Sequence, residues 1–206
     1  MHAAEFLSLL IVLFGEAIVL LPKARGRFAL KFSRWLVIIS VVLISAAQAQ
    51  ATRNQFLAWH NDTAFGQYLL PPYQNIGYFV RYAFVHFWAS YLIAGVLALA
   101  VFWITRFLNK KFGERFFERE ELYFLALGIF LSSHPAWILY ITIIIVWYFI
   151  VALCALLARH SFSVGGRFAK ETHRVSFYYF WLPAVALAII ASQYMSGSEW
   201  YNSLML

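Results

Sequence analysis

Few side chains of this 206-residue chain combine a reactive type with an apolar setting. Glu16 is the clearest, because it interrupts an apolar run that ends at Pro22. A polar group inside a membrane span is costly unless it is paired or hydrated, so it is a functional candidate by default. Two interpretations of Glu16 remain: a proton-carrying or ion-binding carboxylate, or a carboxylate that pairs with Arg34 or reaches the headgroups.

Two glutamines form the second candidate, at the end of the next apolar run. Gln48 and Gln50 lie in the small, polar sequence 46–50. Small residues and amides suit close helix packing within a membrane, and they also suit the wall of a transport path. Both interpretations are retained, and the transport path would also include the broken segment around His134 and Pro135, since broken helices are typical of transporter binding sites.

Three histidines are expected at similar depth on one side of the membrane. His60 falls in a polar connection, His86 in an apolar run and His134 at a break between two runs. Imidazoles can bind a metal or serve as axial haem ligands. No two of them share a ligand-like spacing, so the alternative is three separately hydrogen-bonded side chains. No catalytic residue is predicted, because Ser132, Ser133 and His134 are adjacent only in sequence.

The basic residues predict which elements position these candidates. Fourteen of the sixteen Lys and Arg residues fall into three short segments, Lys23–Arg34, Arg106–Glu121 and Arg159–Ser176. Loops rich in Lys and Arg stay on the cytoplasmic side, so all three are expected inside. The longest polar connection, Thr52–Gly77, contains only one basic residue and is expected outside.

The apolar runs between these loops predict an all-α, polytopic transmembrane bundle of about six membrane segments, with both termini on the non-cytoplasmic side. A helical crossing needs about 20 predominantly apolar residues, so the fourth run is either a short span or a re-entrant segment buried in protein. The runs are Glu5–Leu21, Trp35–Ala51, Tyr78–Thr105, Leu122–Leu131, Ala136–Ala158 and Val175–Tyr194.

Composition supports a single integral membrane domain over residues 1–206. Apolar residues make up 63% of the chain and charged residues 12%, against about 25% charged in a soluble domain. The formal charge of +7 is explained by attraction to anionic headgroups, so nucleic acid is not expected as a partner.

The last ninety or so residues resemble type IV prepilin peptidases and related bacterial membrane proteins. The shared order is an acidic helix start, an apolar run, a proline break, a basic loop and a Phe-containing helix entry. In this chain these features are Glu118, Glu120 and Glu121, then Leu122–Leu131, Pro135, the third basic segment and Arg174–Phe180.

The chain departs from that family in its catalytic residues. The family uses two cytoplasmic aspartates, one in a Gly-x-Gly-Asp motif, and such a carboxylate pair shares a proton. This chain has one aspartate, Asp62, which the charge pattern places outside, and one cysteine, which excludes a four-cysteine zinc site. The resemblance therefore implies a relative without the catalytic aspartates, and no catalytic residue is carried over.

These observations lead to three hypotheses about function. The first is a non-enzymatic membrane protein that contacts the lipid bilayer and other membrane subunits as part of a complex. The second is a small transporter or channel. The third is a degenerate prepilin peptidase-like protein or a haem- or metal-binding intramembrane protein. The sequence does not identify a cofactor.

Overall fold

The computed structural model is helical throughout the residues that it describes, which are 3–19, 27–62, 65–113, 117–161 and 180–203. No strand occurs in these ranges. The predicted all-α class is confirmed. The longer helices are α1 (Ala3–Val19), α2 (Arg27–Asn61), α4 (Ala89–Lys111), α5 (Arg119–Ser132), α6 (Trp137–Ser161) and α7 (Trp181–Met195).

Two short helical turns and two short α-helices complete the described part of the chain. A 3₁₀ turn, η1 (Gly66–Leu69), precedes α3 (Ile76–Ala83), and a π-helical turn, η2 (Phe84–Trp88), joins α3 to α4. The Asn75 side chain caps α3 by accepting a hydrogen bond from the Gly77 backbone N–H at 2.8 Å. The last element is α8 (Glu199–Asn202).

Three helices in the described ranges are long and apolar enough to cross a membrane: Leu30–Asn61, Ile76–Lys111 and Trp137–Cys154. The prediction of six spans is too high by this measure. The helices α1, α5 and α7 contain 17, 14 and 15 residues. At about 1.5 Å per residue they reach only about 21–26 Å, short of a hydrocarbon core of about 30 Å.

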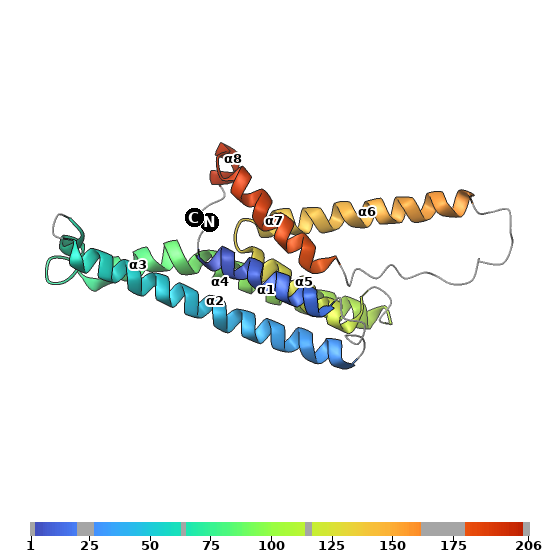
Figure 1. The fold of residues 1–206 in the computed structure, drawn as a ribbon, viewed down its shortest axis with the longest axis horizontal. Coiled ribbons are helices and arrows are strands. Elements are labelled where there is room, and N and C mark those ends of the chain that lie inside the picture. The colour runs from blue at the N-terminus through green and yellow to red at the C-terminus, as the bar shows by residue number, and fades with distance from the viewer. Residues whose placement is uncertain (1–2, 20–26, 63–64, 114–116, 162–179, 204–206) are drawn as a thin grey trace.

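The second helix is much longer than the predicted run Trp35–Ala51. It contains 35 residues without a glycine or proline, so nothing in its backbone chemistry ends it before Asn61. The connection predicted over Thr52–Gly77 is therefore helical over its first ten residues. As a result α2, together with α3, projects past the other helices (Figure 1).

The short helix α5 lies at the centre of the bundle, where it packs against α4, α7, α2, α6 and α1. Its side chains are largely buried, including Phe124, Leu127, Ile129 and Leu131. This burial is compatible with both predicted forms of the fourth run, a short span and a re-entrant segment buried in protein. Gly128 is required here, because a Cβ at that position would collide with the ring of Tyr140 from α6.

The predicted break between α5 and α6 is confirmed. Ser133 takes a positive φ of 60°, and the His134–Pro135 peptide is cis. The chain reverses there, and α6 runs back beside α7 (Figure 1). Only 6% of the apolar window of α6 is buried, so the other described residues leave most of this helix uncovered.

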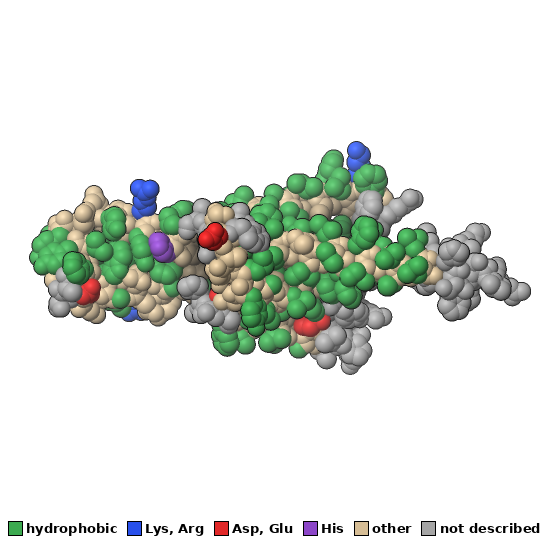
Figure 2. Space-filling model, turned by 90° about the horizontal axis from the view of Figure 1, so that it is seen from above, with side chains coloured by type: hydrophobic (Ala, Val, Ile, Leu, Met, Phe, Trp, Pro, Cys, Tyr) green, Lys and Arg blue, Asp and Glu red, His purple; other side chains and the backbone are tan. Residues whose placement is uncertain are grey.

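The outer surface is apolar along its length. Large side chains such as Val96, Trp103 and Phe149 are exposed, and Figure 2 shows hydrophobic groups spread over the face in view with few charged ones between them. Because such a surface is unsuited to water, a membrane environment follows from the described residues.

Candidate functional site

The most distinctive site is a cavity at the end of the bundle where α2 begins, α4 ends and α5 begins. We call it the basic pocket. It has a volume of about 350 Å³ and carries four cationic side chains from three helices. Its described lining is Leu30, Arg34, Phe102, Arg106, Asn109, Lys110, Arg119, Leu122 and Tyr123. None of these lining residues is acidic.

The helix ends that form the pocket are held by backbone-directed hydrogen bonds. Asn109 is 3% exposed; its Nδ2 donates to the Phe117 carbonyl at 2.8 Å, and its Oδ1 accepts from the Phe117 N–H at 3.1 Å. These two bonds join the last turn of α4 to Phe117, beside the start of α5; Gly113, just after α4, has a φ of 71°. They hold the end of α4 close to the start of α5.

A capping box fixes the start of α5. The Glu118 side chain accepts from the backbone at the third helical position, and the Glu121 Oε2 accepts from the Glu118 N–H at 2.9 Å. This reciprocal arrangement satisfies two N–H groups that would otherwise lack partners. Both carboxylates are therefore engaged by the backbone of the helix, and neither belongs to the described lining of the pocket.

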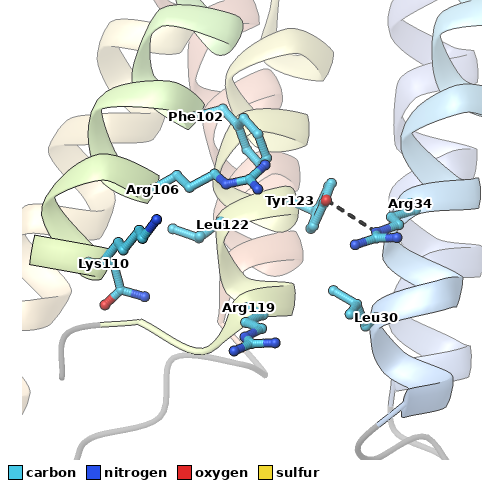
Figure 3. A pocket seen from close by; sticks show the side chains of 9 residues that line it. Leu30, Arg34, Phe102, Arg106, Lys110, Arg119, Leu122 and Tyr123 are labelled. Carbon is cyan, nitrogen blue, oxygen red and sulfur yellow. Dashed lines mark hydrogen bonds between the residues drawn. The ribbon is translucent and has the colours of Figure 1, made fainter. Parts of the chain in front are cut away.

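Tyr123 forms the back of the pocket. Arg34 donates its Nε–H to the Tyr123 hydroxyl at 3.2 Å, and its guanidinium carbon lies 5.6 Å from the ring centroid. Figure 3 shows Arg34 and Arg106 reaching from α2 and α4 toward this tyrosine. The planar guanidinium groups thus face a shared space, a geometry suited to phosphate or carboxylate oxygens.

An apolar cavity of about 430 Å³ continues from the pocket along α2, α4 and α5; we call it the apolar groove. Phe102 and Tyr123 line both cavities, so the two are adjacent. Its lining includes Val41, Ile44, Gly95, Leu99 and Ala126, with Gln48 and Trp88. At the Trp88 end of the groove, the Trp88 Nε1–H donates to the Thr52 hydroxyl at 3.1 Å.

The predicted polar candidates lie in different environments and do not form one site. Gln48 is buried and lines the apolar groove, whereas Gln50 is exposed, with its Nε2 3.5 Å from the Asn54 Oδ1. Glu16 is half-buried, and its Oε2 has no hydrogen-bond partner within the part of the chain that the structure describes. Arg34, proposed as its partner, contacts Tyr123 instead.

The three histidines each have a local neighbour. The His60 ring stacks on Phe56, and the His86 ring stacks on Tyr82 at 4.1 Å between centroids. The Trp137 Nε1–H donates to His134 Nδ1 at 3.1 Å. Across the described ranges, no three His, Cys, Asp or Glu side chains gather in a way that could hold a metal ion.

A polar cluster at the opposite end of the bundle was not predicted. Gln193 of α7 donates to the Glu5 carboxylate of α1 at 3.0 Å. Tyr201 of α8 is buried beside it, and this burial raises the pKa of the phenol, with the Glu5 charge adding to the rise and a Ser192 hydrogen bond opposing it. The cluster ties together helix ends that are far apart in sequence, which the linear pattern does not reveal.

Comparisons with known protein families, characterised proteins and solved structures gave no match to this chain. The site is therefore interpreted from its own geometry.

Proposed function

We propose that the protein is a multi-pass membrane protein without catalytic activity that acts as a component of a larger membrane complex. The observation that carries the proposal is the length of α6 that the other described residues leave uncovered. This 25-residue apolar helix packs on the bundle with its first half, where Tyr140 lies against Gly128. The Trp147 ring stacks on Phe180 at 4.4 Å. Its exposed side chains, such as Phe149 and Leu156, offer a surface for helices of another subunit.

The charge distribution supports one orientation. Arg34, Arg106, Lys110 and Arg119 lie together around the basic pocket. Cytoplasmic segments of membrane proteins carry such an excess of Lys and Arg. We therefore propose that the basic pocket faces the cytoplasm.

Three buried serine hydroxyls support a structural role over a catalytic one. Ser40, Ser132 and Ser192 each donate to a backbone carbonyl three or four residues earlier in the same helix, at 2.6 to 2.7 Å. Such bonds satisfy a buried hydroxyl within its own helix.

Cysteine labelling tests the multi-pass orientation. In a Cys154→Ala background, single cysteines at Gln74 and Lys111, both exposed, should react with an impermeant maleimide from opposite sides of the membrane. Labelling of both positions from one side of sealed vesicles would overturn the orientation.

Site-specific photo-crosslinking tests membership of a complex. A photoreactive amino acid at Phe149 of α6 should yield one discrete protein adduct in the native membrane. The matched control is Trp103 of α4, which is also exposed but lies on a helix that already packs along α5. Lipid adducts alone at Phe149, or the same adducts at both positions, would contradict the proposal.

A further inference from the structure

We infer that the basic pocket and the apolar groove together form a binding site for one anionic phospholipid. The phosphate would lie among the arginines of the pocket and one acyl chain in the groove. The inference rests on the membrane location in the proposed function, but it does not depend on membership of a complex.

The headgroup half of the site follows from charge complementarity. Arg34, Arg106, Lys110 and Arg119 converge from three helices on one cavity. A phosphate oxygen accepts paired hydrogen bonds from a guanidinium, so arginine favours phosphate recognition through geometry as well as charge. Basic pockets between membrane helices bind anionic headgroups for the same reason.

The two carboxylates of the capping box, Glu118 and Glu121, lie outside the described lining of this cavity. Glu118 and Glu121 are turned toward the backbone at the start of α5 by the capping box, and Glu121 is 2% exposed. The cap also satisfies N–H groups at that helix end, so the anion would be held by side-chain cations and not by the helix terminus.

The acyl half of the site follows from the length and lining of the groove. It extends along α4 from Phe102 to Trp88, a distance of about 21 Å at about 1.5 Å per residue. One leaflet contributes about half of the roughly 30 Å hydrocarbon core, so the groove accommodates an extended chain that starts at a headgroup in that leaflet. The bonded pair Trp88 and Thr52 lies at its far end.

Contact between the two cavities favours one amphipathic ligand over two separate ones. Phe102 and Tyr123 belong to both linings, so the change from cationic to apolar surface occurs across two side chains. A soluble phosphate would leave the apolar groove unfilled, and a neutral lipid would bring no anion to Arg34 and Arg106. An anionic phospholipid satisfies both halves.

Lipid titration of the full-length protein in neutral detergent, followed by native mass spectrometry, tests the inference. The probes are phosphatidylglycerol, phosphatidylcholine with the same acyl chains, and glycerol phosphate. We expect phosphatidylglycerol to bind at least about tenfold more tightly than the other two. Equal binding of phosphatidylcholine would overturn the headgroup assignment, and equal binding of glycerol phosphate would identify a soluble anion as the ligand and overturn the lipid assignment.

A charge variant with a matched control locates the headgroup. Removing two arginines, Arg34→Gln with Arg106→Gln, should weaken phosphatidylglycerol binding about 30-fold, since each cation near a headgroup contributes about one kcal/mol. The control, Arg53→Gln with Arg81→Gln, removes the same charge from exposed positions outside the pocket and should change binding less than about twofold. An equal loss in both variants would show nonspecific attraction and refute the site.

A groove variant tests the acyl half separately. A Cβ at Gly95 would meet only the Phe130 ring, at 3.7 Å, so Gly95→Leu fits the fold and fills the groove. It should weaken phosphatidylglycerol binding while any glycerol phosphate binding stays unchanged; Leu156→Phe on α6 is the control. Unaltered lipid binding in Gly95→Leu would show that the acyl chain does not lie in the groove. Because these measurements are made in detergent on the isolated chain, their failure is distinguishable from failure of the labelling and crosslinking tests.

Discussion

The two ends of α2 use different chemistry to hold their neighbours. At its start, Arg34 contacts Tyr123 in the basic pocket, where amide and carboxylate side chains bond to the backbone. Near its end, Phe56 and Trp59 pack edge-on against Phe79, at 5.3 and 5.4 Å between ring centroids. We call this second region, residues 56–83, the aromatic hairpin. One end gathers like charges around a cavity, and the other is held by ring contacts.

This difference indicates how each end is suited to its surroundings. Directional hydrogen bonds hold the helix ends of the basic pocket in place, so its cations stay together despite their mutual repulsion. Ring packing in the aromatic hairpin requires no charged group, and aromatic side chains are typical of membrane interfaces. The hairpin should therefore lose stability when a ring is removed, whereas the pocket should lose it when a backbone-directed bond is removed.

The largest effect is expected for Phe79→Ala. Phe79 is 6% exposed and joins Leu70 and Ala83 in a small cluster separate from the main core. Removing a buried phenylalanine costs about 3–5 kcal/mol. Hydrogen exchange over residues 76–83 should therefore accelerate by about two to four orders of magnitude.

The control for Phe79→Ala is Val80→Ala, since Val80 is exposed next to it; exchange there should remain near the wild-type rate. Exchange in α5 and α7 should not change in either variant. If α5 accelerates as much as α3 in Phe79→Ala, the hairpin is not an independent unit and the comparison between the two ends fails.

A smaller loss is expected for Asn109→Ala at the basic end. The substitution removes two hydrogen bonds and leaves the Phe117 N–H and carbonyl without their side-chain partner. Leaving a buried backbone group unsatisfied costs about 1–3 kcal/mol. Because Phe117 is only partly buried, we expect the lower end of this range for each bond, a total loss of about 2 kcal/mol in thermal unfolding monitored by circular dichroism in detergent.

Lys111→Ala is the control for Asn109→Ala, because Lys111 is exposed at the same end of α4 and its removal changes charge without breaking these bonds. It should alter stability by less than about 0.5 kcal/mol. Similar losses in the two variants would mean that the charge at this end, and not the Asn109 bonds, determines its stability.

The sequence predicts the basic end better than the aromatic hairpin. Clustered Lys and Arg residues and the Ser-Ser-His-Pro break predict a charged end and a short segment before the break, and both are found in the structure. The convergence of Arg34 with Tyr123 could not be predicted, because these residues are 89 positions apart. Only tertiary packing brings them together.

The aromatic hairpin was missed because local composition was misleading. The polar residues around Arg53 and Asn54 suggested a loop, yet the segment contains no helix breaker and is helical to Asn61. Packing of Phe56 and Trp59 on Phe79 stabilises that extension, and such long-range contacts override weak local preferences. Local composition also gave no sign of the ring contacts of His60 and His86, whose aromatic neighbours lie within the aromatic hairpin.

The smallest effect on stability is expected for Tyr123→Phe, in the basic pocket. The change keeps the ring that lines both cavities and removes only the hydroxyl that accepts from Arg34. An exposed hydrogen bond of this kind contributes about 0.5 kcal/mol, so the thermal midpoint should shift by at most about 2 °C.

Arg34 would retain its position over the ring but lose its orienting bond, so phosphatidylglycerol binding should weaken by about two- to threefold. A loss as large as that of the Arg34 and Arg106 double variant would mean that the hydroxyl itself contacts the headgroup. No loss would mean that Arg34 needs no orientation by α5, and that charge alone determines recognition at this end.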